Sequence, residues 1–220
     1  LISPILANVY LHYVLDLWFE KCIKKQLYGE AYLVRFADDF LIMFQYERDA
    51  QRVYEAIIKR MELFGLELSK EKTRILPFGR NCGTRETFDF LGFTHFNSKT
   101  RKGYYTVGHK ISRKKKKQFK SNLKKWVKEN RNTQFDEFMK ALNKKLTGSF
   151  NYYSLSGMIR EVRNLWHHSL YVTFKWMNRR SQRRSFKLER FYEIWNDRII
   201  HPYIHVDIWN GDKVIYNKNV

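Results

Sequence analysis

The chain has 220 residues, enough for one large or two modest domains. Its 44% hydrophobic and 17% aromatic residues can fill a sizeable core, which argues against a disordered chain. The formal net charge of +20 is unevenly placed: residues 1–100 carry 14 Lys and Arg against 13 Asp and Glu, whereas residues 101–220 carry 28 against 9. A nearly neutral half followed by a strongly basic half indicates that the second half holds a polyanion.

Cysteine usage and hydropathy narrow the class of protein further. Cys22 and Cys82 are far apart and form no Cys-x-x-Cys pair, so neither a disulfide framework nor a zinc site is indicated. A reducing cytoplasm, bacterial or organellar, is therefore expected. No apolar run approaches the roughly 20 residues that span a bilayer, and no signal peptide is present, so we expect no membrane association. The chain opens at Leu1 inside a patterned segment, which predicts a fragment of a longer protein.

The first half reads as helices packed on an antiparallel sheet, an α+β arrangement. Ser3 as N-cap and Pro4 as the first helical residue predict a helix that runs to about Lys25. Apolar runs on both sides of Asp38-Asp39 predict a strand hairpin. Further predicted elements are an amphipathic helix over 50–64 ended by Gly65, short strands at 66–68, 73–76 and 88–93, and a hairpin around Gly103.

The second half reads as a small helical bundle. Five consecutive cations, residues 113–117, begin a predicted helix, and two more helices are expected over 134–146 and 158–178. Asn151-Tyr152-Tyr153 is expected between the last two helices. Residues from Arg198 onward are irregular. We therefore expect domains at 1–110 and 111–190, followed by a tail at 191–220.

The adjacent carboxylates Asp38 and Asp39 are the main candidates for chemistry. Two like charges this close repel unless a cation compensates them, and oxygen-seeking Mg²⁺ suits the role; a solvent-exposed hairpin turn is the alternative. Phosphoryl transfer onto a nucleic-acid end uses two metal ions about 4 Å apart, held by several carboxylates. Asp16, Asp49 and Asp89 lack a matching strand context, so the sequence offers no third ligand.

Residues 35–40, Arg-Phe-Ala-Asp-Asp-Phe, resemble the Tyr/Phe-x-Asp-Asp motif of reverse transcriptases. Five further blocks resemble, in order, those of group II intron-encoded reverse transcriptases: residues 2–11, 64–73, 88–93, 146–153 and 176–182. The resemblance implies the C-terminal part of a polymerase right-hand palm followed by an α-helical thumb, or maturase, region. It also implies that the fingers and the family's first metal-binding Asp lie upstream of Leu1, so we expect the chain alone to be inactive.

The resemblance assigns roles by position. Asp38 and Asp39 match the aspartates that hold catalytic Mg²⁺, for which Mn²⁺ can substitute. Lys72 falls near a proposed general acid for pyrophosphate, or it is a solvated surface lysine. The positions that match contacts to primer, template or incoming nucleotide are Phe36, Ala37, Ser3 and Pro4, together with the primer-gripping turn Phe90-Leu91-Gly92, which otherwise reads as a core strand.

Cations in the second half are candidates for RNA binding, because clustered charges that repel one another are relieved by a phosphate backbone with release of counterions. For Tyr152 and Tyr153, base stacking and core packing are both left open, whereas Trp166 is predicted to lie in the core. The candidate RNA-binding residues are Arg113, Lys114, Lys115, Lys116, Lys117, Lys120 and Lys124 in one helix, with Arg179, Arg180, Arg183 and Arg184 near a later helix end.

The predicted function is that of an RNA-directed DNA polymerase and intron maturase. Its expected partners are group II intron RNA, an RNA template with a DNA primer, and deoxynucleoside triphosphates; homodimerisation is left open. The alternative is a non-catalytic RNA-binding splicing factor on the same fold. A generic DNA-binding protein ranks last, because the sequence has no helix-turn-helix or zinc module.

Overall fold

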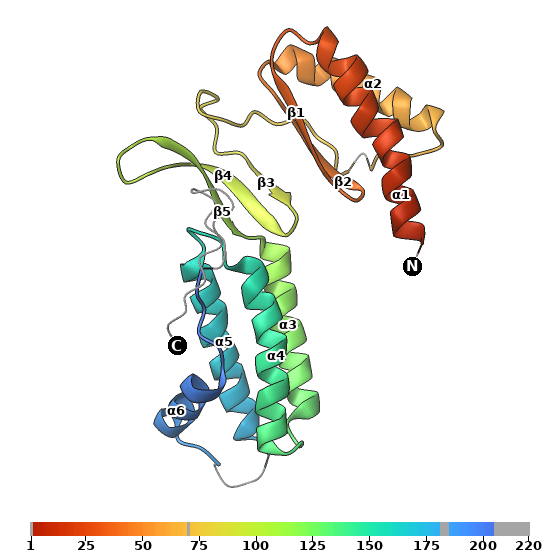
Figure 1. Cartoon of the computed structure of the whole chain (residues 1–220). Coiled ribbons are helices and arrows are strands. Elements are labelled where there is room, and N and C mark those ends of the chain that lie inside the picture. Colours follow the sequence, from red (N-terminus) through yellow and green to blue (C-terminus); the bar gives the residue numbers. More distant parts are fainter. Residues whose placement is uncertain (1, 70, 181–184, 205–220) are drawn as a thin grey trace. The chain divides into compact units, whose positions relative to one another are not determined.

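The computed structural model describes residues 2–69, 71–180 and 185–204 (Figure 1). It divides into two compact units, and the division passes through two strands of one small sheet. The first unit comprises residues 1–91 and 97–107, and the second comprises residues 92–96 and 108–220. No helix in the described ranges is long and apolar enough to cross a membrane. Helices with small sheets confirm the α+β class.

The N-terminal helix is continuous through Gln26 but is not a regular α-helix. Helix α1 (Ser3–Leu11) passes into π-helical turns η1 (His12–Asp16) and η2 (Phe19–Ile23) and a 3₁₀ turn, η3 (Lys24–Gln26). The predicted Ser3 cap is wrong, because Ile2 is the N-cap and no side chain caps the helix. A π-helical turn frees backbone carbonyls, and Arg60 Nε donates to the carbonyl of Val14 at 3.1 Å.

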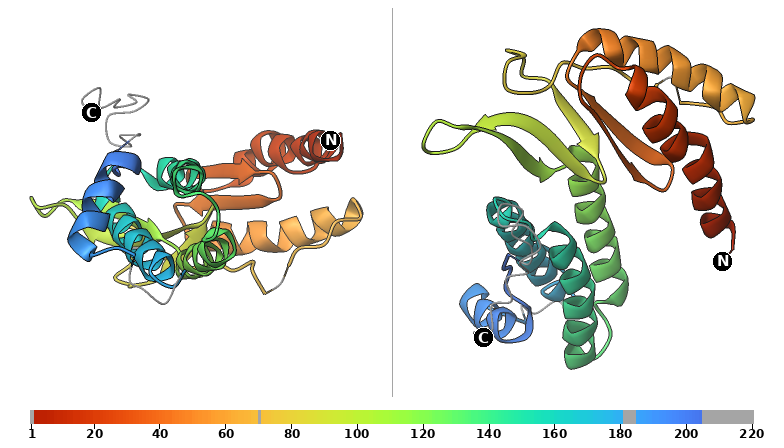
Figure 2. Two further views of the ribbon diagram at one scale, coloured as in Figure 1. Left: turned by 90° about the horizontal axis from the view of Figure 1, so that it is seen from below. Right: turned by 45° about the horizontal axis from the view of Figure 1, so that its top comes forward.

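The predicted hairpin is confirmed as β1 (Ala31–Phe36) and β2 (Asp39–Phe44), which pair antiparallel with Phe36 opposite Asp39. Because side chains alternate across a strand, the hairpin has two faces. One face, bearing Ala31 and Leu33, packs with the N-terminal helix and α2 (Glu47–Leu63) in the core of this unit (Figure 2). The other face exposes the apolar side chains of Tyr32, Val34, Phe36 and Met43.

Three predicted strands need correction. Residues 66–68 and 73–76 form no strand. After Gly65 ends α2 at a φ of +68°, Leu66 N–H donates back to the Met61 carbonyl at 2.8 Å, and the Leu66 and Leu68 side chains pack on the core. Residues 88–93 are not one strand, because a two-residue turn separates β3 (Thr87–Phe90) from β4 (Phe93–Lys99). The expected hairpin at Gly103 joins β4 to β5 (Tyr105–Ile111), and the strand order is β3-β4-β5.

The second unit is a bundle in which α3, α4 and α5 run side by side, with the short α6 against one end (Figure 1). Helix α4 extends to Tyr153, so Asn151, Tyr152 and Tyr153 lie in its last turn and not between helices. Helix α6 was not predicted. It crosses residue 190, and its Phe191 and Trp195 belong to the shared core. The bounds are α3 Arg113–Asn130, α4 Phe135–Tyr153, α5 Ile159–Met177 and α6 Leu188–Arg198.

Candidate active site and nucleic-acid interface

The two adjacent carboxylates stand at the tip of the β1–β2 hairpin. Ala37 and Asp38 form its two-residue turn, and Asp39 is the first residue of β2. Both carboxylates are exposed, and within the described residues neither has a cation within 4 Å. Phe36 lies opposite Asp39 on the outward face with 65% of its surface exposed. The turn therefore presents two acidic groups and one aromatic ring to solvent.

Arg35 fixes this turn from the inward face of the hairpin. Its Nε and Nη2 donate two parallel bonds to Asp16 at 2.8 and 2.7 Å, and Nη1 donates to Asn8 Oδ1 at 2.9 Å. Nη1 also donates to the carbonyl of Ala37 at 2.8 Å. The guanidinium lowers the pKa of the Asp16 carboxyl, and the same ion pair raises the pKa of Arg35. One partly buried cation thus ties the turn to the N-terminal helix.

The turn holds its backbone in an unusual conformation. Ala37 has a φ of +54°, a region that costs a residue with a Cβ roughly 1 kcal/mol and that two-residue hairpins usually give to glycine. The other non-glycine with positive φ in the described chain is Leu91, at +49° in the β3–β4 turn. Such strain persists where surrounding contacts enforce it and gathers at functional sites. Both turns were candidate sites on sequence grounds.

Two further acidic residues of the first unit, Asp16 and Asp49, serve the fold and are not free to bind a metal ion at the turn. Arg35 binds both oxygens of the Asp16 carboxylate, and His12 Nδ1 lies 3.3 Å from its Oδ2. Asp49 is buried, and its Oδ2 accepts bonds from the backbone N–H groups of Tyr28 and Gly29 at 3.0 and 3.1 Å. Across the described ranges, no group of three or more metal-ligating side chains comes together.

The other candidate residues of the first unit are placed separately. Ser3 and Pro4 are exposed in the first turn of α1. Lys72 is exposed in a turn, where its backbone N–H bonds to the Ser69 carbonyl at 3.0 Å. Within the described residues, the structure records no hydrogen bond or ion pair from Lys72 to either carboxylate of the turn.

Phe90, Leu91 and Gly92 form the end of β3 and the turn that follows it. Leu91 and Gly92 both have positive φ, the pattern of a tight two-residue hairpin. Gly92 belongs to the second unit, where its carbonyl accepts a bond from the Ser112 N–H at 3.0 Å. A Cβ at Gly92 would lie 3.5 Å from the Lys115 side chain and 3.7 Å from the Tyr153 hydroxyl. Gly92 therefore lies beside the start of α3 and the end of α4.

Tyr152 and Tyr153 differ in environment, which the sequence left open. Tyr153 is buried, and burial raises the pKa of its hydroxyl. Tyr152 is 53% exposed and stacks on Phe93, with ring centres 5.5 Å apart. Trp166 is buried as predicted, and its Nε1 donates to the Ile200 carbonyl at 3.1 Å.

The basic residues of α3 form a surface stripe. Arg113, Lys117, Lys120 and Lys124 recur at spacings of three and four, so they share one side of the helix, and all are exposed. Lys114 and Lys115 are also exposed, on other sides. Lys116 differs, because it forms an ion pair with Glu161 of α5.

The described arginines of the cluster near the end of α5, Arg179 and Arg180, differ in their exposure and contacts. Arg179 is exposed, whereas Arg180 bonds to the Thr133 carbonyl at 2.9 Å and contacts the Met177 sulfur, so it supports the bundle. Arg183 and Arg184 lie outside the described residues.

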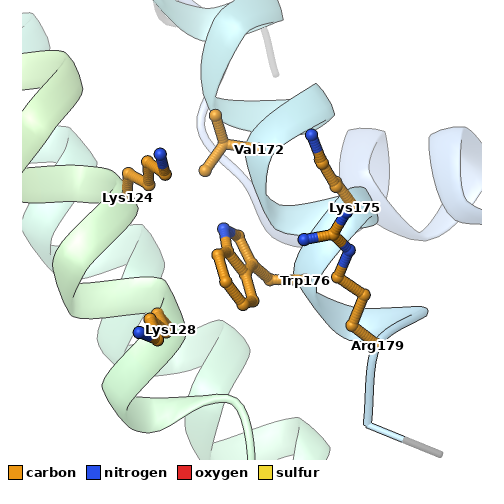
Figure 3. A pocket seen from close by; sticks show the side chains of 6 residues that line it. All are labelled: Lys124, Lys128, Val172, Lys175, Trp176 and Arg179. Carbon is orange, nitrogen blue, oxygen red and sulfur yellow. The ribbon is translucent and has the colours of Figure 1, made fainter.

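Sequence reasoning missed two features. Arg35 was part of a motif but received no role; its signal is a charged residue at an inward position of an otherwise apolar strand. Lys128, Lys175 and Trp176 line a pocket with Lys124 and Arg179 (Figure 3). The signal for this pocket is two cation pairs at a spacing of four, one of them flanking a tryptophan.

Matches to known protein families cover most of the chain. Residues 1–95 match the family described as reverse transcriptase (RNA-dependent DNA polymerase). Residues 116–193 match the group II intron, maturase-specific domain. The comparison with curated proteins found no match. The two domains follow one another in the order that the motif blocks predicted, and the chain belongs to the reverse transcriptase/maturases of group II introns.

Proposed function

We propose that Asp38 and Asp39 hold divalent metal for RNA-templated DNA synthesis, and that the basic second unit binds intron RNA and the template–primer. The observation that carries this proposal is the hairpin tip, where two adjacent carboxylates are exposed, lack a cation partner among the described residues, and are fixed by Arg35. A purely solvated turn does not require strain at Ala37 or a partly buried arginine beneath it.

The donor set fits Mg²⁺, which prefers carboxylate oxygens and keeps several waters. When bound, the ion supplies Lewis acidity toward the attacking and leaving oxygens of phosphoryl transfer. Asp38 and Asp39 hold it, Arg35 keeps the turn in place, and the exposed Phe36 ring lies beside Asp39 where it can contact a terminal primer nucleotide. The same fit favours Mn²⁺ as a substitute.

Metal binding tests the first part of the proposal. In the chain bound to an RNA template with a DNA primer, Mn²⁺ should broaden the amide NMR signals of residues 36–40. The broadening should be lost in Asp38→Asn and Asp39→Asn. Glu55→Gln, which changes an exposed carboxylate of α2, is the matched control and should leave it intact. Equal broadening in all four proteins would remove the carboxylate pair from the metal site.

Primer extension tests the chemistry. With Mg²⁺ and deoxynucleoside triphosphates, we expect little or no extension by the chain alone, because Asp16 and Asp49 are both engaged in the fold and leave two carboxylates where a two-metal site needs more. Robust extension that disappears in Asp38→Ala would show that another group completes the site.

Nucleic-acid affinity tests the second part. Binding to group II intron RNA should weaken steeply with salt, since the exposed cations of α3 would replace counterions on phosphates. Binding to duplex DNA of the same length should be weaker at every salt concentration. Equal affinity for both would contradict the maturase role. RNA binding without metal at the turn would instead favour the non-catalytic splicing factor.

A further inference from the structure

A pocket of about 450 Å³ opens between α3 and α5 in the second unit. Trp176 lies at its centre, with cationic side chains from both helices around it (Figure 3). The lining residues are Lys124, Lys128, Val172, Lys175, Trp176 and Arg179.

The cations around this pocket stand in pairs one helical turn apart. Lys124 and Lys128 follow one another on α3, and Lys175 and Arg179 on α5 or directly after it. Arg131, just after α3, also lies 5.2 Å from the Trp176 ring centre. In the described part of the chain, none of these five has a carboxylate within 4 Å. Their charge is therefore available to an anionic ligand.

Three of these cations lie over the indole ring at cation–π distances from its centre. Lys128, Arg131 and Arg179 lie 5.9, 5.2 and 5.3 Å from the ring centre. A stacked guanidinium comes much closer, as Arg48 does over Tyr28 at 3.7 Å. Trp176 is only half-buried. The ring therefore keeps surface on which a flat group can stack.

A simple anion site needs positive charge but no aromatic ring, whereas a nucleotide can use both the cations and the indole. Bases stack on aromatic rings while the backbone follows positive charge. A base can reach such a ring only when it is unpaired, because paired bases are stacked inside the duplex. The cationic stripe of α3, defined by Arg113, Lys117, Lys120 and Lys124, leads along the helix to this pocket.

We propose that the Trp176 pocket holds one unpaired nucleotide of the bound nucleic acid, with its base on the indole and its flanking phosphates on Lys124, Lys128, Lys175 and Arg179. This inference rests on the proposed function that the second unit binds RNA, and it adds a site that distinguishes single strands from duplexes.

The test distinguishes contacts to the base from contacts to the phosphates. The probes are three short fluorescein-labelled single strands: oligouridylate RNA, oligothymidylate DNA, and an abasic strand of equal length. Trp176→Ala should weaken binding of the uridylate about tenfold, the scale of one stacked base, without changing binding of the abasic strand. Trp176→Phe should recover most of the loss. Lys124→Ala with Lys128→Ala should weaken binding of all three strands.

Matched controls come from the same helical bundle. Lys140→Ala with Lys144→Ala removes the same charge from exposed positions of α4 outside the pocket lining, and Tyr171→Ala removes an exposed aromatic ring from α5. The α4 variant should weaken binding of the three strands less than Lys124→Ala with Lys128→Ala does, and Tyr171→Ala should leave the difference between uridylate and abasic strands unchanged. Circular dichroism melting verifies that each variant is folded.

The results of this experiment either support or overturn the pocket. Equal losses for uridylate and thymidylate support a pocket that contacts the base, and a loss confined to RNA supports one that also contacts the ribose. An unchanged Trp176→Ala variant, or one that loses the abasic strand equally, overturns the pocket while leaving the proposed function intact. If the wild-type chain binds none of the strands and no intron RNA, the proposed function itself fails.

Discussion

The turn of the first unit and the basic surface of the second use their charges in opposite ways. In the first unit, Arg35 beneath the turn is bound to Asp16 and Asn8. In the second unit, the cations of α3 and of the Trp176 pocket face solvent, and Lys116 is the member of the α3 set that forms an ion pair in the described chain. Internal pairing fixes a turn in one geometry, whereas unpaired charge attracts a polyanion. The Arg35 network is therefore suited to positioning, and the cations of α3 and the pocket are suited to affinity.

The hydrophobic cores of the two units also differ. The described core of the first unit contains seven buried apolar residues around the hairpin, and that of the second contains eighteen along four helices. A larger apolar core supplies stability that does not depend on polar contacts. The hairpin unit should depend on its polar network, and the bundle should tolerate exposed, repelling cations.

The largest expected effect is the loss of Trp195 from the bundle core. This side chain is fully buried and packs edge-on to Trp166, with ring centres 6.0 Å apart. Trp195→Ala should lower the free energy of unfolding of the second unit by about 4 kcal/mol, measured by urea unfolding. Tyr192→Ala, at an exposed position of the same helix, should cost less than about 1 kcal/mol. Similar losses for both would mean that α6 is not part of this core.

A second prediction concerns Arg35. Arg35→Ala should destabilise the first unit by about 2 kcal/mol, because it leaves the partly buried Asp16 unpaired and removes the bond to the Ala37 carbonyl. Amide hydrogen exchange in β1 and β2 measures the loss. Arg35→Lys should recover only part of it, since lysine cannot make the two parallel bonds.

The control for this prediction is Arg52→Ala, which changes an exposed arginine of α2. It should leave exchange in the hairpin unchanged. A comparable acceleration in both variants would indicate that net charge, and not the Arg35 network, stabilises the turn.

Local signals predicted the elements that rest on local causes. Apolar runs around Asp38-Asp39 predicted the hairpin, and Gly65, at a φ of +68°, ends α2 as its position suggested. The errors arose where tertiary contacts decide. Leu66 and Leu68 look like strand residues but pack on a helical core with no strand partner, and α6 is short and rich in charge, so its buried Phe191 and Trp195 gave little periodicity.

The candidate site was predictable in identity but not in geometry. The motif names Asp38 and Asp39, yet only the fold shows that Asp16 is taken by Arg35 and that Asp49 binds the Tyr28–Gly29 backbone. The Trp176 pocket joins residues from helices about 50 positions apart in sequence, and no periodicity within one helix could reveal it.

A third prediction separates the units by salt dependence. Arg113→Gln with Lys117→Gln should reduce the slope of log affinity against log salt for intron RNA by about two, since each phosphate contact contributes about one. Lys21→Gln with Lys25→Gln removes the same charge from exposed positions of the first unit and should leave the slope unchanged. Equal reductions would mean that RNA responds to the total charge of the chain and not to the stripe on α3.

The smallest expected effect is on stability in acid. As the pH falls, the second unit should lose stability before the first. Burial lowers the pKa of His109, and burial together with the charge of Lys120 lowers the pKa of His168, both from an ordinary 6.5. Below pH 6.5, these two histidines therefore bind protons more readily in the unfolded chain than in the folded second unit. The free energy of unfolding of this unit should fall as the pH drops from 6.5 toward the lowered pKa values.

In the first unit, Arg35 lowers the pKa of Asp16 below 3.8, so its contribution is complete at neutral pH and is lost only as the pH falls through that lowered pKa. Urea titrations followed by resolved NMR signals of each unit, at several pH values, should show the second unit weakening first. His109→Gln with His168→Gln should abolish that early loss, and His167→Gln, at an exposed neighbouring position, should not. If the hairpin unit weakened first instead, the Arg35–Asp16 pair, which stays ionised until the pH falls through the lowered pKa of Asp16, would not be what holds this unit together.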